Sequence, residues 1–180
     1  SKNLFSSESS LKYFLTQAIA SAIFIFAIIL FFLIINIKFN IVNYISILIC
    51  STIMLKRGAA PFHFWAPDVY DGAPTVFTSF MLSIIKVSGF VAFLRLFDTS
   101  FNNVQQQWQN LVAFIILATL VIGNITAVFQ QSVKRMMAYS SIAQAGFMLF
   151  AIFALGQPAK EGLILYAAAY CLASIGFFAI

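Results

Sequence analysis

The chain has 180 residues, of which 62% are hydrophobic and 8% are charged, and its mean hydropathy is +0.99. A transmembrane helix needs about 20 mainly apolar residues, and the chain has several such runs, so the composition excludes a soluble globular domain. The formal net charge is +5, but some cations lie within the apolar runs, which argues against a nucleic-acid-binding protein.

The predicted fold class is all-α, a polytopic transmembrane bundle of about six helices. The first ten residues are polar and lack the basic and apolar regions of a secretory signal peptide. We expect the first helix from Leu11 to Ile37, with Lys12 as its only charge. The simplest interpretation of Lys12 is a side chain that extends along the helix to the membrane surface.

The second helix is expected from Ile41 to Ala60, with Lys56 near its end. Pro61 lacks an N–H and must break the helix, leaving a short helical remnant to Trp65 and a loop from Pro67 to Pro74. In hydrocarbon, a break survives only where protein or water satisfies the freed backbone groups, and transporters place ion sites there. The broken helix is therefore the predicted functional region.

The third helix is expected from Thr75 to Phe97, and Lys86 lies at its middle. A charged lysine at the bilayer midplane costs roughly 2.5 to 3.5 kcal/mol on insertion scales. That cost must be offset by a partner, by water or by loss of the proton. The alternative is a lysine that is merely tolerated at a packed helix interface.

The remaining helices are expected at Leu111–Phe129, Met136–Leu155 and from just after Glu161 to Ile180, with a polar loop at Phe101–Asn110. Lys134 and Arg135, in the turn before the fifth helix, are most simply anchors of the positive-inside rule. Counting cations on alternate sides gives four against three, which places the N-terminus on the cytoplasmic or matrix side.

The two cysteines, Cys50 and Cys171, each lie alone in an apolar run, and the chain has one histidine. Neither a disulfide, a zinc site nor an iron–sulfur site is indicated, and no nucleotide-binding loop is present in the sequence. We therefore expect no metal and no cofactor on this chain.

Two sequence segments point to a known family. The first runs from Lys56 through Pro61-Phe62-His63, Trp65 and Pro67-Asp68-Val69-Tyr70 to Gly72-Ala73-Pro74-Thr75, and the second is Val133–Ile142, with Lys86 between them. In this order they resemble the NADH dehydrogenase subunit 2 family, the N-type antiporter-like subunits of respiratory complex I. The residues from Asp68 to Gly72 resemble this family more than the sister subunits or the sodium/proton antiporters.

The resemblance implies a longer subunit built from two inverted five-helix repeats. Residues 1–97 would be the end of the first repeat and residues 98–180 the start of the second. The chain would then be a central fragment, or one piece of a split subunit whose missing helices come from a second chain. The implied location is the mitochondrial inner membrane, with a bacterial plasma membrane as the alternative.

The resemblance also implies roles for three lysines. Lys56 takes the position of the proton-carrying lysine of the first half-channel, Lys86 that of a lysine on the central hydrophilic axis, and Lys12, before Tyr13, that of a further half-channel lysine. A low-dielectric interior favours the neutral form of a lysine, whereas a nearby carboxylate favours its charged form. A chain of such lysines can therefore relay protons.

Several other residues are supporting candidates. Arg57 stands where the family often has an apolar residue and lies about 100° round the helix from Lys56, so we expect it to pair with Asp68 or Asp71. His63 is either a proton entry residue or a structural hydrogen-bonder.

The first turns of the fifth predicted helix hold a polar patch that includes Tyr139 and Gln144. Gln144 stands where many relatives have a histidine, so it can form hydrogen bonds but cannot titrate. Lys134 and Tyr139 belong to the segment that carries the resemblance, and we count both with Gln144 as supporting candidates.

The implied function is proton translocation driven by quinone reduction elsewhere in complex I, whose FMN, iron–sulfur clusters and ubiquinone belong to the rest of the complex. The expected partners are other membrane-arm subunits and lipids, without nucleic acid. The family's acid partner of Lys56 and a later lysine have no counterpart here. A structural remnant that no longer pumps and a stand-alone cation/proton antiporter module are therefore alternatives. The first interpretation predicts a carboxylate from outside the chain about 4 to 6 Å from Lys56.

Overall fold

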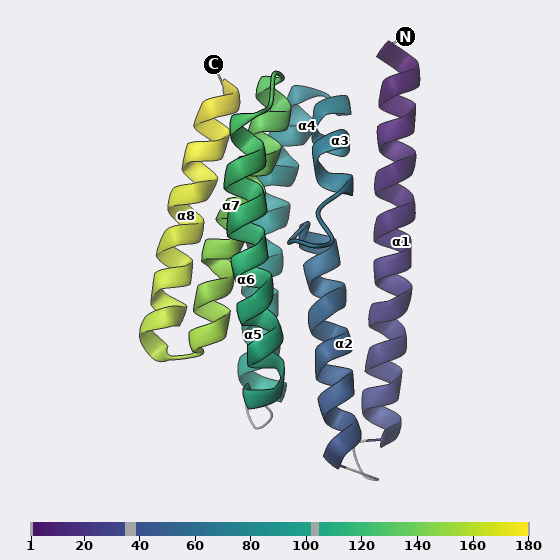
Figure 1. Ribbon diagram of the computed structural model, residues 1–180, viewed down its shortest axis with the longest axis vertical. Coiled ribbons are helices and arrows are strands. Elements are labelled where there is room, and N and C mark those ends of the chain that lie inside the picture. The colour runs from purple at the N-terminus through teal and green to yellow at the C-terminus, as the bar shows by residue number, and fades with distance from the viewer. Residues whose placement is uncertain (1, 35–38, 102–104, 180) are drawn as a thin grey trace.

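The computed structural model describes residues 2–34, 39–101 and 105–179, and within these ranges the regular elements are helices. The elements are α1 (Lys2–Ile34), α2 (Phe39–Arg57), α3 (Trp65–Gly72), α4 (Thr75–Phe80), the π-helical turn η1 (Met81–Ile85), α5 (Lys86–Ser100), α6 (Gln105–Val128), α7 (Val133–Ala154) and α8 (Gln157–Ala179). Figure 1 shows them as roughly parallel rods, with the start of α1 and the end of α8 at the same end of the bundle. The prediction of an all-α membrane bundle is confirmed.

Most of the rods match the length and composition of a membrane span. Among the described residues, five stretches are long and apolar enough to cross a membrane: Leu4–Leu33, Thr75–Ser100, Trp108–Val128, Val133–Ala154 and Gln157–Ala179. The remaining rod is interrupted, because α2 and α3 follow one another along the bundle with a non-helical segment between them (Figure 1). Helix α1 packs against both α2 and α3.

The non-helical segment at residues 58–64 satisfies its backbone groups by several routes. Gly58 has a positive φ of 66°, a conformation that glycine adopts without a side-chain clash. The Ala60 N–H donates to the Thr119 hydroxyl of α6 at 3.1 Å, and the Trp65 indole donates to the Leu55 carbonyl at 3.0 Å. The predicted break at Pro61 is confirmed, although α2 ends slightly earlier than expected, at Arg57. The helical remnant expected up to Trp65 is wrong, because residues 60–64 form turns and the next helix begins at Trp65.

The predicted loop from Pro67 to Pro74 is wrong, because most of it forms α3. Pro67 is the third residue of this helix, and the first four N–H groups of a helix have no acceptor within it. The missing N–H of Pro67 therefore costs no helical hydrogen bond. Asp68 in the first turn also interacts favourably with the helix dipole.

The pass from Thr75 to Ser100 is continuous but contains η1 directly before Lys86. Its existence was predicted and its π turn was not. Single π turns inside α-helices occur frequently at functional sites.

Helix α1 begins at Lys2, so the prediction that the polar first ten residues precede the helix is wrong. The hydroxyls of Ser7, Ser9 and Ser10 donate to helix carbonyls three residues earlier, at 2.8 to 2.9 Å, and are satisfied inside the helix. Similarly, α6 begins at Gln105 within the predicted polar loop Phe101–Asn110. The predicted end of the first helix at Ile37 lies outside the described residues.

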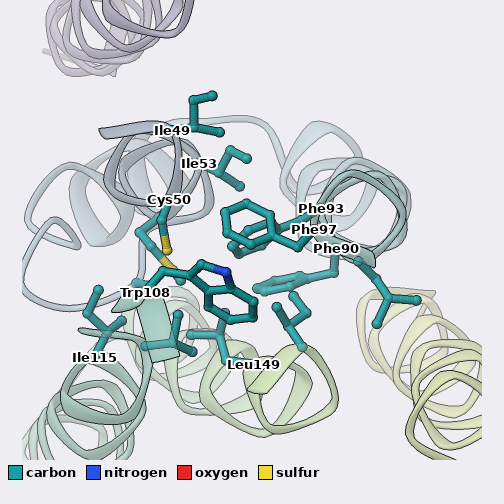
Figure 2. Packing of buried hydrophobic residues seen from close by; sticks show 14 of the residues in the cluster. Ile49, Cys50, Ile53, Phe90, Phe93, Phe97, Trp108, Ile115 and Leu149 are labelled. Carbon is teal, nitrogen blue, oxygen red and sulfur yellow. The ribbon is translucent and has the colours of Figure 1, made fainter. Parts of the chain in front are cut away.

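A large apolar cluster joins α2, α5, α6 and α7. Figure 2 shows Trp108 of α6 at its centre, with Phe93 and Phe97 of α5 on one side and Cys50 of α2 nearby. The rings of Trp108 and Phe97 lie 4.8 Å apart in an edge-to-face arrangement. Since α2 and α5 run in opposite directions, this packing sets the end of α2 beside the beginning of α5 (Figure 1). Lys56 and Lys86 are thereby brought to the same level of the bundle.

Candidate functional site

A cavity of about 140 Å³ lies at the level of the helix break. Three passes contribute to its wall: α1, the interrupted pass formed by α2 and α3, and the pass that contains η1 and Lys86. The lining residues are Tyr13, Gln17, Lys56, Arg57, Trp65, Tyr70, Met81, Ile85 and Lys86. The structure therefore brings two of the three predicted relay lysines, and Arg57, to one cavity.

Lys86 is almost completely buried, with 3% of its surface exposed. Its ammonium donates to the carbonyl of Ser141 and, at 3.0 Å, to the Ser141 hydroxyl. That hydroxyl donates in turn to the Ala138 carbonyl at 2.7 Å. Within the described part of the chain, no carboxylate forms an ion pair with Lys86, so neutral acceptors on α7 hold this side chain.

Lys56 is half-buried and lies between two cavities. Besides the first cavity, it lines one of about 310 Å³ together with Phe24, Ile53, Arg57, Gly89, Ala92, Phe93 and Leu96. Its ammonium lies 5.9 Å from the centre of the Phe24 ring, a cation–π contact. The surroundings of Lys56 are thus not closed by apolar side chains. The carboxylate expected from outside the chain stays a prediction.

The expected pairing of Arg57 with Asp68 or Asp71 is wrong. One guanidinium nitrogen of Arg57 donates to the Ile85 carbonyl at 2.6 Å, and its Nε is buried with no hydrogen-bond partner among the residues that the structure describes. Because α2 ends at Arg57, the side chain crosses to the neighbouring pass instead of following α3. Gly89 on that pass leaves the space that the guanidinium occupies.

The two aspartates of α3 face other partners. Asp68 forms ion pairs with Lys12 at 3.1 Å and with Arg135 at 3.3 Å, and Lys12 also pairs with Glu8 at 2.7 Å. Asp71 accepts a hydrogen bond from Ser132 at 2.9 Å. Lys12 therefore belongs to a half-exposed ion cluster that ties α3 to α1 and α7, and it does not line the cavity with the other two lysines.

The other supporting candidates also lie outside this cavity's lining. The rings of His63 and Tyr139 lie 6.4 Å apart, and His63 Nδ1 is buried without a partner among the described residues. Lys134 donates to the Ala73 carbonyl at 2.9 Å, which attaches the start of α7 to the end of α3. Gln144 accepts a hydrogen bond from the Tyr166 hydroxyl.

The sequence prediction missed several polar members of the site. Tyr13 and Gln17 line the cavity from α1, and their spacing of four residues places them on one face of that helix. This spacing was visible in the sequence. The contact between Lys86 and Ser141 was not, since it depends on how α5 and α7 pack.

Comparison with protein families gives one match over the whole chain. The family model described as the NADH:quinone oxidoreductase/Mrp antiporter transmembrane family matches residues 1–180. NADH-quinone oxidoreductase subunit N of Desulforamulus reducens is 38% identical over 96% of this chain, and NAD(P)H-quinone oxidoreductase subunit 2 of Prochlorococcus marinus subsp. pastoris is 36% identical over 96%. The matches cover 39% and 37% of these two relatives, so the chain spans about two fifths of their length.

Two solved structures share the fold. The chain matches a respiratory complex I structure from Thermus thermophilus with bound aureothin, with a TM-score of 0.74 and 34% identity over 93% of this chain and 39% of the other. It matches the Mrp complex from Dietzia sp. with a TM-score of 0.88 over 96% of this chain and 34% of the other, at 17% identity. The second likeness concerns the fold alone.

Proposed function

Because the chain belongs to the NADH:quinone oxidoreductase/Mrp antiporter transmembrane family, we propose that it is a proton-conducting part of an antiporter-like membrane subunit of complex I. The observation that carries this proposal is the shared cavity of Lys56 and Lys86 at a helix break. Two amines at one cavity inside an apolar bundle are costly to place there. A proton relay would explain why both are present.

The proposed path begins at Lys56, which lines both the larger second cavity and the cavity at the helix break. From Lys56 the proton crosses the shared cavity, whose Tyr13 and Gln17 side chains offer hydrogen-bonding groups. It then reaches Lys86, whose ammonium is stabilised by the Ser141 carbonyl and hydroxyl. The Ser141 contact directs the next step of the path towards α7.

The free energy for this movement would come from quinone reduction elsewhere in the complex, where FMN, iron–sulfur clusters and ubiquinone act. The proposed partners are the other membrane-arm subunits, the lipids and the helices that complete the subunit, supplied by a second chain if the subunit is split. The proposed location is the mitochondrial inner membrane. The two relatives described above are bacterial, which keeps the bacterial plasma membrane as the alternative.

One observation favours a second candidate, a structural remnant that does not pump. Lys86 already has hydrogen-bond partners on α7, so it could be a lysine that packing tolerates. A proton relay and a tolerated lysine differ in their dependence on the amine, because only the relay needs a titratable group at this position.

Lys86→Met tests the proposal, since methionine fills nearly the same volume without a titratable group. We expect the complex to assemble and NADH-driven proton pumping per assembled complex, measured in membrane vesicles, to fall strongly. Arg95→Met on the exposed side of the same helix is the matched control and should pump normally. Undiminished pumping by assembled Lys86→Met complex would favour the structural remnant.

A further inference from the structure

Arg57 is a third cation beside Lys56 and Lys86, and the proposed relay does not use it. It lines both cavities, and among the described residues no carboxylate forms an ion pair with it. Arginine does not lose its proton in proteins, so this is a permanent charge inside an apolar bundle. Such a charge is costly unless it makes specific contacts.

The contacts of Arg57 converge on the turn that precedes Lys86. The guanidinium donates to the carbonyl of Ile85, the last residue of η1, at 2.6 Å. It also lies against Gly89, where an added Cβ would overlap the guanidinium. Ile85 and Gly89 are four residues apart and therefore share one helix face. The carbonyl of Ile85 and the absence of a side chain at Gly89, on one helix face, therefore determine where the guanidinium lies.

Lys86 follows Ile85 directly, so whatever fixes the end of η1 also fixes the direction in which the Lys86 side chain leaves the helix. The same guanidinium repels the amines of the cavity it shares with Lys56 and Lys86, since all three groups can carry positive charge. It therefore opposes simultaneous protonation of both lysines. A relay in which one proton moves from one lysine to the next requires that condition.

We propose that Arg57 is a positioning residue of the relay, which holds the turn before Lys86 and keeps a fixed positive charge at the cavity between the two lysines. This inference rests on the proposed function of the lysines. It adds a residue that neither accepts nor releases a proton but sets the geometry and charge around those that do.

The first test compares Arg57→Met with Arg57→Lys in membrane vesicles containing the intact complex. Arg57→Met removes a hydrogen bond made by a charged group, and we expect proton pumping per assembled complex to fall about tenfold. Arg57→Lys keeps the charge and a donor for the Ile85 carbonyl, so it should recover at least about half of the pumping. A purely structural role would change the amount of complex and not the pumping per complex.

The second test uses Gly89→Ala, in which Arg57 keeps its charge but loses its place against α5. Pumping per complex should fall as in Arg57→Met, whereas Gly162→Ala, at an open position on α8, should have no effect. In an Arg57→Ala background the added methyl group has room, so Arg57→Ala/Gly89→Ala should pump as well as Arg57→Ala alone. Additive losses in the double variant would contradict the proposed contact.

Lys86→Met is measured in parallel to separate the two proposals. Normal pumping by Lys86→Met would overturn the relay itself. Loss of pumping in Lys86→Met with normal pumping in both Arg57→Met and Gly89→Ala would overturn the role of Arg57 alone. If Arg57→Met does not assemble, Gly89→Ala decides the question, because normal pumping in that variant contradicts the role of Arg57.

Discussion

Lys86 and Ser141 show how neutral acceptors can hold a buried lysine inside a membrane bundle. Hydroxyl and backbone carbonyl oxygens bind an ammonium less strongly than a carboxylate does. The backbone carbonyl of Ser141 is always present, whereas its hydroxyl depends on the side chain. The hydroxyl is therefore the adjustable part of this contact.

Ser141→Ala should lower NADH-driven proton pumping per complex by about two- to tenfold, the usual worth of one hydrogen bond. The carbonyl contact remains, so pumping should not be abolished. Ser140→Ala is the matched control, because the neighbouring serine is half-buried and the hydrogen bonds of Lys86 in the described structure go to Ser141. Equal effects of the two substitutions would show that the hydroxyl of Ser141 has no specific role.

The residue-scale predictions from sequence succeeded where one helix decides the outcome and failed where packing between helices does. The midpoint position of Lys86 and the place of Lys56 before Pro61 follow from counting along single helices. The partner of Arg57 depends on the space left by Gly89, a feature of a different pass. The ion pairs of Asp68 depend on α3, which was expected to be a loop.

The broken helix is the element on which the site depends. Two half-helices, α2 and α3, place an end of each near the middle of the bundle, where the freed N–H and C=O groups need partners. The Thr119 hydroxyl of α6 accepts a hydrogen bond from the break, and the Trp65 indole donates one to the end of α2. The break is thus an ordered segment held by specific hydrogen bonds.

Thr119→Val should destabilise the break, since valine keeps the shape of threonine but cannot accept the hydrogen bond of the buried Ala60 N–H. Leaving a buried donor without a partner costs about 1 to 3 kcal/mol. We expect the subunit to dissociate from the solubilised complex at a lower temperature. Thr126→Val on the same helix removes only a bond to that helix's own Ile122 carbonyl and should shift the temperature less.

At the element scale, the sequence indicated every pass but not their exact ends. Apolar length predicts a span, whereas the ends depend on local hydrogen bonds. The serines of α1 were interpreted as a polar segment, yet they bond to their own helix. The π turn before Lys86 has no signature in residue composition, because it differs from an α-helix only in hydrogen-bond register.

At the scale of the whole chain, the apolar cluster around Trp108 sets the geometry of the cavity. It joins α2, α5, α6 and α7 and so fixes the level of the ends of α2 and α5 (Figure 2). Lipid is as apolar as these side chains, so close packing between helices contributes much of the association. Loss of a large ring from this cluster should therefore disturb the geometry of the cavity.

Trp108→Ala should destabilise the bundle by about 3 to 5 kcal/mol, the usual cost of removing a large buried aromatic side chain. We expect lower abundance of the assembled subunit in membranes, measured by quantitative immunoblotting. The matched control is Phe114→Ala on the same helix, where the phenylalanine is 66% exposed. Equal loss of abundance in both variants would show that the cluster is not what holds α6 in place.

The most direct test of the central claim, that Lys56 and Lys86 serve one proton path through the shared cavity, is a comparison of Lys56→Met, Lys86→Met and the double variant. The measured quantity is the number of protons pumped per NADH oxidised by assembled complex in vesicles. Two steps in series predict that each single variant lowers this ratio by the same amount and that the double variant lowers it no further. Losses that add in the double variant would place the two lysines on separate paths and contradict the account.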